Sequence, residues 1–251
     1  MRSARTSYVL TPHEIAHDQA IRPHYEAFQW AWQQYAERMD WREGIGMDAY
    51  DELGSDTRYL VVVNRDGQFE AGVRVTPVAD LTACQSIDMW AGVFARHDPA
   101  VSRQLTANAG LLGEIKRDVM EGRLWDVTRL VTRVESDQGP HPSIDHTRSH
   151  SDIIRLVGMI AGVAGIGGRT LYTTTRQLHR FLARARVLSE VVLEAIINPT
   201  RDEPPSYLCF ADPSKWFANV KHVLGTRSFE EGYRAACERD HCPQPQSFGI
   251  P

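Results

Sequence analysis

Five charged residues of this chain have the types and spacing that acid–base chemistry requires. Asp48 and Asp51 bracket a tyrosine in the segment MDAYD. Arg74 lies in the apolar segment GVRVT, and Asp126 and Arg129 lie in WDVTR. An arginine in an apolar strand is costly unless a carboxylate pairs with it, so these residues predict an ion-pair network. Such a network either supports the fold alone or holds carboxylates where one accepts a substrate proton.

The spacing of Asp126 and Arg129 decides whether their side chains meet. Residues three apart on a regular strand point to opposite faces of the sheet. A β-bulge between them would bring both side chains to one face, and bulges are common beside active sites. A meeting of Asp126 with Arg129 thus requires an irregular strand.

The segment before these residues is predicted to be helical over residues 12–38. Thr11 suits the N-cap, with Pro12 in the first turn and Glu14 three residues after Thr11. Pro23 divides the segment into two helices, because proline removes a backbone hydrogen bond. The second helix has one aromatic face, formed at spacings of three and four by Tyr25, Phe28, Trp32 and Tyr35.

The clearest strand signal is a β-hairpin that contains Arg74. Residues 58–63 and 69–77 flank the turn residues 64–67. Residues 124–134 form a further strand. The remaining elements are expected as helices within 99–121, over 151–165 with Ser151 or Asp152 near the cap, and over 176–192, 216–224 and 229–237, with strands over 169–175 and 206–211.

Helices and strands are interleaved along the chain without an internal repeat or a clear linker. This order favours one α/β domain over residues 1–251, with a mixed central β-sheet flanked by helices. The proline-rich residues 238–251 are expected to form a loosely held tail. The glycine-containing residues 162–167 are interpreted as a helix end and not as a phosphate-binding loop.

Composition argues against several classes of function. The net charge of −4 does not point to nucleic acid, and the longest apolar run, residues 157–168, is too short to cross a bilayer. The four cysteines form no CxxC pair. The N-terminus has no apolar secretory segment, so the chain is expected in the cytoplasm with reduced thiols. His146 and His150 lie in a polar segment where no metal site is expected.

A row of arginines recurs every four residues within the expected helix 176–192. Its members are Arg176, Arg180 and Arg184. Like charges at this spacing destabilise an isolated helix. The row is either a plain solvated face or a docking surface for an acidic partner protein.

Taken in order, these segments resemble a known family. An aromatic helix is followed by the motif D-x-Y-D (DAYD, 48–51), the hairpin YLVVV…GVRVTP and the strand WDVTRLV. The combination is similar to the acyl-homoserine lactone synthases, the autoinducer-making enzymes of bacterial quorum sensing, over residues 20–210. The resemblance implies a GNAT-like fold and an acyltransferase. In its reaction, the amine of S-adenosylmethionine takes an acyl group from an acyl-carrier-protein or acyl-CoA thioester, and lactonisation releases methylthioadenosine.

The resemblance also implies catalytic roles. Asp48 and Asp51 would surround the amine and the sulfonium. Asp126 would act as a base or an orienter. Arg74 and Arg129 would hold these carboxylates in place. No cofactor is implied, because S-adenosylmethionine and the thioester are substrates.

On the substrate side, the resemblance implies that helices 12–40 cover the S-adenosylmethionine site. Phe28, Trp30, Trp32 or Trp41 would supply an aromatic face for the sulfonium. Arg22 would supply a cation nearby. Thr174 would hydrogen-bond a 3-oxo or 3-hydroxy group of the acyl chain. The arginine row would dock the carrier protein, and the protein would be a monomer or a homodimer.

The chain departs from the family pattern at four positions. Asp126 replaces a glutamate, Gly46 a second glutamate, His24 an arginine and Gln34 a tryptophan. All four changes concern the amine-substrate side of the site. They keep two alternatives open: an N-acyltransferase that acts on another amine without lactonisation, and a non-catalytic module that binds acyl lactones or carrier protein.

Overall fold

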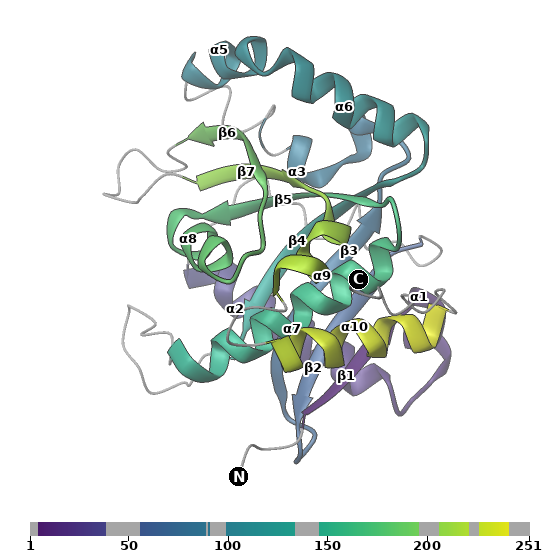
Figure 1. The fold of residues 1–251 in the computed structure, drawn as a ribbon. Coiled ribbons are helices and arrows are strands. Elements are labelled where there is room, and N and C mark those ends of the chain that lie inside the picture. The colour runs from purple at the N-terminus through teal and green to yellow at the C-terminus, as the bar shows by residue number, and fades with distance from the viewer. Residues whose placement is uncertain are drawn as a thin grey trace, which may run out of the picture.

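The computed structural model describes residues 5–38, 56–88, 90, 99–133, 146–195, 206–220 and 226–240. Within them, the strands form a single sheet of order β1-β2-β3-β4-β5-β7-β6. Figure 1 shows helices on both faces of this sheet, which confirms the expected α/β fold class with a mixed sheet flanked by helices. The strands are β1 Arg5–Leu10, β2 Arg58–Asn64, β3 Phe69–Pro77, β4 Leu124–Thr132, β5 Arg169–Thr175, β6 Glu190–Ala195 and β7 Ser206–Ala211.

Helices lie in the described connections between these strands, except in the β2–β3 turn. The two most N-terminal helices lie between β1 and β2, and a short turn of 3-10 helix, Leu81–Ala83, follows β3. The described helices are α1 Pro12–His17, α2 Arg22–Arg38, α3 Gln85–Asp88, α5 Pro99–Ala107, α6 Ala109–Met120, α7 His146–Ala164, α8 Arg176–Arg184, α9 Pro213–Val220 and α10 Thr226–Asp240. None of the described helices is both long and apolar enough to cross a membrane.

The predicted hairpin is confirmed as β2 and β3. The side-chain oxygen of Asn64 accepts hydrogen bonds from the backbone N–H groups of Asp66 (2.9 Å) and Gln68 (3.0 Å). Gly67 has a φ of 76°, which glycine adopts without a steric penalty. The turn thus sets the register of two strands whose valines are buried.

The pairing of β4 with β5 is parallel, whereas the other strand pairs are antiparallel. It runs from Leu124 opposite Arg169 to Val127 opposite Tyr172. Both strands continue further, but the described register contains no β4–β5 pair beyond Val127 and Tyr172. The sheet therefore opens between β4 and β5 at this point.

The two faces of the sheet have separate cores. On one face, α7 packs on Val62 and Val73 through residues such as Ile154. On the other face, α2 covers Val61 and Val131. Figure 1 shows α7, α8, α9 and α10 on the first face and α2 behind the sheet. The first face is called the α7 face below and the second the α2 face.

Helices α1 and α2 confirm the predicted break before Pro23. Thr11 caps α1 with a capping box, in which its hydroxyl accepts from the N–H of Glu14 and the Glu14 carboxylate accepts from the N–H of Thr11. Helix α2 begins at Arg22, so Pro23 lies in its first turn. There its missing N–H costs no helical hydrogen bond.

The expected start of the helix over 151–165 is wrong, because α7 begins at His146. Ser151 and Asp152 do not cap it. Ser151 shares a 2.7 Å hydrogen bond with Ser228 of α10, and buried Asp152 accepts a 2.6 Å bond from Arg5 of β1. Both side chains therefore serve tertiary contacts.

The expected helix over 176–192 is also wrong in its second half. Helix α8 ends at Arg184, and Glu190–Ala195 is strand β6. Arg186 has a φ of 61°, which a continuing helix does not allow, and Val192 and Leu193 pack into the core. Strand β1, which was not expected, pairs antiparallel with β2 along its length. Residues 241–251 of the expected tail lie outside the described part of the chain.

Candidate active site

A β-bulge in β4 brings Asp126 and Arg129 to the same face of the sheet. Between the pairs Gly72–Val131 and Arg74–Thr128, β4 has one residue more than β3. Arg129 has a φ of 58°, in the left-handed region that is rare for residues other than glycine. Strand β4 therefore has the irregularity that the sequence requires for Asp126 and Arg129 to share a face.

The packing of β4 follows this bulge. Trp125, Val127 and Leu130 all contact the core of the α7 face. Val131 belongs instead to the core beneath α2. Without the bulge, residues 130 and 131 would exchange faces, and the side chain of Arg129 would be directed into the apolar core.

Arg74 lies beside this bulge in the middle of β3 and is 1% exposed. Its Nε donates a 3.0 Å hydrogen bond to the hydroxyl of Thr128 on β4. Its Nη2 also donates to the side-chain oxygen of Gln85, at the start of α3. Arg74 therefore ties the short helix α3 to the strands that carry Asp126 and Arg129.

Asp126 is buried and bound to α3. Its carboxylate accepts hydrogen bonds from the backbone N–H of Ser86 (3.1 Å) and from the Ser86 hydroxyl (2.5 Å). Burial raises the pKa of Asp126, while the bonds from Ser86 and the charge of Arg74 act in the opposite direction. A raised pKa makes the carboxylate a stronger proton acceptor, but its described bonds are structural ones that orient α3.

Arg129 is 4% exposed and faces α2. Its Nη1 lies 3.5 Å from the side-chain oxygen of Gln29, and the Gln29 amide donates a 2.8 Å hydrogen bond to the hydroxyl of Tyr25. A polar chain thus runs from the bulge to the aromatic face of α2. The sequence reasoning missed Gln29, although its place four residues after Tyr25 puts both on one side of the helix.

Gln85 and Ser86 were missed for a different reason. They lie in a segment without clear periodicity, and α3 spans only Gln85–Asp88. Their partners Arg74 and Asp126 are distant in sequence, so no local pattern indicates them. Only the folded sheet brings these polar groups together.

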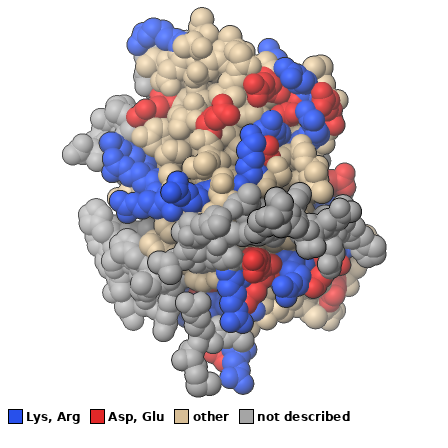
Figure 2. All heavy atoms as spheres, viewed as in Figure 1, with Lys and Arg blue, Asp and Glu red and all other residues tan. Residues whose placement is uncertain are grey.

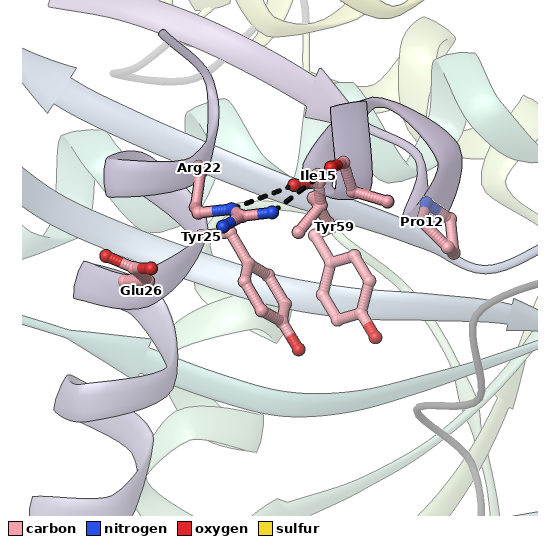
Figure 3. Close-up of a pocket in the computed structure, with 7 residues that line it drawn as sticks. Pro12, Ile15, Arg22, Tyr25, Glu26 and Tyr59 are labelled. Atoms are coloured by element: carbon pink, nitrogen blue, oxygen red, sulfur yellow. Dashed lines mark hydrogen bonds between the residues drawn. The ribbon is translucent and has the colours of Figure 1, made fainter. Parts of the chain in front are cut away.

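The N-terminal half of α2 borders a cavity of about 300 Å³. In Figure 3, the rings of Tyr25 and Tyr59 point the same way below the guanidinium of Arg22. Arg22 donates to the backbone oxygens of Ile15 (3.3 Å) and Ala16 (3.1 Å), so it joins α1 to α2. Pro12 and Glu26 complete the lining. The lining is mostly apolar and includes one cation, Arg22, and one anion, Glu26.

The aromatic candidates on α2 are not brought together around one ligand. Phe28 is fully buried beneath α2, where its ring lies against Gly72 and near Tyr59. Trp32 is buried and packs on Tyr35. Trp30 is 66% exposed on the outside of the helix. Contact of these three rings with a substrate stays a prediction.

Several predicted residues lie outside the described part of the chain. They are Asp48, Asp51, Trp41 and Gly46. Their predicted proximity to Arg74 and Arg129 therefore stays a prediction. The substituted position His24 is described: its ring stacks on Tyr8 at 4.4 Å, and burial lowers its pKa. His24 thus favours a neutral imidazole that packs on β1.

On β5, Thr174 lies on the α7 face, two residues from Tyr172. It is buried, and its hydroxyl donates to the backbone oxygen of Thr175 at 3.3 Å. Thr173 faces the other way and accepts a 2.9 Å bond from the indole N–H of Trp90. Thr174 is therefore close to the opening between β4 and β5.

The predicted arginine row is exposed on α8. Arg176, Arg180 and Arg184 are all solvent-exposed, and Thr175 caps the helix. Figure 2 shows basic side chains gathered over the region that α8 occupies in Figure 1. The described residues contain no group of three or more His, Cys, Asp or Glu side chains that could hold a metal ion.

No protein-family model and no curated protein matches this chain. Solved structures do match it. The structure of TofI in a ternary complex with an inhibitor and MTA is 13% identical with a TM-score of 0.52, and the match covers 89% of this chain and 99% of that one. The acyl-homoserine lactone synthase LasI is 15% identical with a TM-score of 0.52, over 89% of this chain and 98% of that one.

A third match is BjaI, described as a CoA-dependent acyl-homoserine lactone synthase and solved with SAM and isopentyl-CoA. It is 11% identical with a TM-score of 0.51, and the match covers 96% of this chain and 91% of that one. These likenesses extend over most of both chains in each comparison. The chain therefore has the fold of the acyl-homoserine lactone synthases.

Proposed function

We propose that this protein is an acyl-homoserine lactone synthase, an acyltransferase that makes a quorum-sensing signal in the cytoplasm. One observation carries the proposal: in a fold shared with such synthases, the bulge turns Arg129 to the face of the sheet on which Asp126 and Arg74 lie. Buried charges that are gathered beside a strand irregularity are typical of active sites. The buried cysteines Cys84 and Cys209 form no disulfide, which suits a reducing compartment.

The proposed reaction has two bond exchanges. The amine nitrogen of S-adenosylmethionine attacks the thioester carbonyl, an amide forms, and the thiol leaves. The methionine carboxylate oxygen then attacks the carbon next to the sulfonium, so that a lactone forms and methylthioadenosine leaves. BjaI was solved with SAM and isopentyl-CoA and TofI with MTA, which supports this choice of substrates and product.

The described residues support positioning roles in this reaction. Arg129 presents a guanidinium on the α2 face, where it can pair with a substrate carboxylate or with an aspartate. Asp126 holds α3 in place through Ser86, and Arg74 does so through Gln85. Asp48 and Asp51 are proposed to approach the amine and the sulfonium, where one of them accepts the amine proton.

The acyl donor is proposed to approach from the side of α8. The exposed Arg176, Arg180 and Arg184 suit a carrier with negative charge, either an acidic acyl carrier protein or the phosphates of coenzyme A. BjaI and MesI are both described as CoA-dependent, which supports acyl-CoA as a donor to be tried.

The first test is mass spectrometry of the purified protein incubated with S-adenosylmethionine and a pool of acyl-carrier-protein and acyl-CoA thioesters. We expect methylthioadenosine and an acyl-homoserine lactone to appear together. Carrier binding without turnover would instead identify a non-catalytic module. Loss of both products in the Arg129→Gly variant would tie the activity to the guanidinium of Arg129, because glycine keeps the positive φ of the bulge.

A second candidate function is N-acyl transfer to another amine without lactonisation. The packing of His24 on Tyr8 favours it, because a neutral imidazole with a lowered pKa does not supply the cation that the family pattern has there. The same experiment separates the two functions. Thioester consumption without methylthioadenosine would establish the simple N-acyltransferase.

A further inference from the structure

Gln29 of α2 lies between the buried guanidinium of Arg129 and the hydroxyl of Tyr25. Nη1 of Arg129 lies 3.5 Å from the side-chain oxygen of Gln29, and the Gln29 amide nitrogen donates a 2.8 Å hydrogen bond to the Tyr25 hydroxyl. Arg129 belongs to β4, whereas Gln29 and Tyr25 both belong to α2. A single amide therefore connects the bulge of the sheet to the helix that covers it.

The amide of Gln29 has one favourable orientation between these two partners. A guanidinium has several N–H donors and no acceptor, so the amide must turn its oxygen towards Arg129. Its nitrogen is then directed to Tyr25, whose hydroxyl oxygen accepts the bond. A reversed amide would bring its own N–H groups against those of Arg129. The hydroxyl of Tyr25 thus holds the amide, and the amide oxygen sets a direction for the guanidinium.

The contact between Gln29 and Arg129 joins a neutral group to a charged one. Arg129 is buried, and a buried charge requires hydrogen bonds or an opposite charge. An amide oxygen accepts a hydrogen bond without neutralising the guanidinium, whereas a carboxylate at the same position would form an ion pair with it. Because the 3.5 Å contact is long for a hydrogen bond, its contribution to stability is small. Gln29 therefore orients Arg129 without competing with an anion for its charge.

We propose that Gln29 is a positioning residue, which directs the guanidinium of Arg129 towards the carboxylate of the amine substrate. The inference rests on the proposed function, in which this substrate is S-adenosylmethionine. Gln29 does not touch the reacting atoms and acts through Arg129. A neutral acceptor suits this role because it orients the guanidinium and leaves the positive charge to the substrate carboxylate.

Three variants separate this role from a purely structural one. Gln29→Leu removes the acceptor and keeps a helix-forming side chain. Gln29→Glu keeps an acceptor and adds a negative charge that pairs with Arg129. Tyr25→Phe keeps the ring and removes the hydroxyl that holds the amide. The control is Gln177→Leu, which makes the same exchange at an exposed position of α8.

Calorimetry compares the binding of two ligands, S-adenosylmethionine and its decarboxylated form, which lacks only the carboxylate. The wild-type protein should prefer S-adenosylmethionine. Its dissociation constant should rise about three- to tenfold in Gln29→Leu, about tenfold or more in Gln29→Glu and about threefold in Tyr25→Phe. The dissociation constant of the decarboxylated ligand should not rise in these variants, and the control should bind both ligands as the wild-type protein does.

Gln29→Glu distinguishes the two roles most sharply. If Gln29 only supports the fold, a carboxylate should strengthen the contact with Arg129 and leave the binding of S-adenosylmethionine unchanged. Urea unfolding should show Gln29→Glu to be at least as stable as Gln29→Leu, and a lower stability would contradict the pairing with Arg129. An equal loss of affinity for both ligands, or unchanged affinity for S-adenosylmethionine in Gln29→Leu and Gln29→Glu, would overturn the inference.

Turnover assays with acyl thioesters separate a failure of this inference from a failure of the proposed function. If the wild-type protein prefers S-adenosylmethionine to the decarboxylated form but releases no methylthioadenosine, the proposed reaction is wrong, and the affinities of the variants still test Gln29. If methylthioadenosine is released but the variants bind both ligands as the wild-type protein does, the role of Gln29 is wrong. A wild-type protein that binds both ligands equally, or binds neither, would also contradict this role.

Discussion

At the residue scale, the candidate site depends on one strained backbone position. Arg129 has a φ of 58°, where a side chain is unfavourable, yet this conformation directs its guanidinium to the face of Asp126. Its neighbours Thr128 and Gln29 link it to Arg74 and to α2. The backbone conformation of Arg129 therefore affects the stability of the fold, and its charge affects the proposed activity. Substitutions can separate the two effects.

The first prediction concerns the charge of Arg129. Arg129→Ala and Arg129→Gly should both lower kcat by about a hundredfold or more, because a buried donor that stabilises charge is lost. Arg129→Gly should unfold at a temperature at least as high as Arg129→Ala, since glycine accepts a positive φ. Steady-state kinetics and thermal melting measure the two effects. The control Arg133→Ala, at an exposed position just after β4, should keep full activity.

The second prediction concerns the pH dependence of stability at Asp126. Its pKa is raised in the folded state, so the folded protein binds this proton more tightly than the unfolded chain does. The contribution of this proton to the stability of the folded protein is therefore complete at low pH. It is lost as the pH rises from about 4, the pKa in the unfolded chain, through the raised pKa in the folded protein. Urea unfolding between pH 4 and pH 7 should show wild type losing stability relative to Asp126→Asn. A pH-independent difference between the two proteins would contradict the prediction.

At the element scale, two helices are specialised in opposite ways. Helix α7 is buried and packs closely on α10, where glycines on both helices allow the backbones to approach. A Cβ on Gly158 would collide with the backbone oxygen of Phe229, and one on Gly232 with that of Arg155. Helix α8 instead exposes its arginine row to solvent. One helix therefore contributes to stability, and the other is available to a partner.

The third prediction tests the close packing of α7 on α10. Gly158→Ala should destabilise the protein by about 1–3 kcal/mol, because the added methyl group forces the two helices apart. The matched control is Gly113→Ala in α6, where nothing lies within 4 Å of an added Cβ. That change should stabilise the protein by roughly 0.5–1 kcal/mol through helix propensity. Chemical denaturation of both variants measures the difference.

The fourth prediction tests the arginine row on α8. Arg180→Glu should raise KM for an acyl-carrier-protein substrate by about tenfold while kcat changes little, because a like charge opposes docking of an acidic partner. The control Arg65→Glu changes another exposed arginine, in the β2–β3 turn, and should leave KM unchanged. If both reversals raise KM equally, net charge and not the α8 surface is responsible.

At the scale of the whole molecule, ion pairs between distant segments hold the outer elements to the sheet. Arg5 of β1 donates to Asp152 of α7, and Arg239 of α10 pairs with Glu14 of α1. The second contact joins elements from opposite ends of the described chain. Together the two contacts tie α7 to β1 and α10 to α1, which no local sequence pattern encodes.

The fifth prediction tests the contact between Arg5 and Asp152. Asp152→Ala should destabilise the protein by about 2 kcal/mol, because it removes a charge-assisted hydrogen bond from a buried position. Asp66→Ala, in the exposed β2–β3 turn, should change stability by less than about 0.5 kcal/mol. If urea unfolding shows that the two variants lose the same free energy of unfolding, the contact of Asp152 with Arg5 stabilises the protein no more than an exposed charge does.

Local patterns in the sequence were sufficient to predict several elements. The alternating apolar run around Arg74 predicted the β2–β3 hairpin, the spacing of aromatic residues predicted α2, and the four-residue spacing of arginines predicted the exposed row on α8. Each signal lies within one segment, because side chains repeat with a period of two on a strand and about 3.6 on a helix. The mixed α/β fold followed from the order of these segments.

The tertiary structure decided the features that depend on residues far apart in the chain. These include the bulge at Arg129, whose extra residue is defined against β3, and the bonds of Asp126 to Ser86 and of Arg129 to Gln29. The early start of α7 depends likewise on the partners of Ser151 and Asp152. Because such contacts form only when the sheet assembles, the sequence alone determined which groups were available, and the folded sheet determined which of them meet.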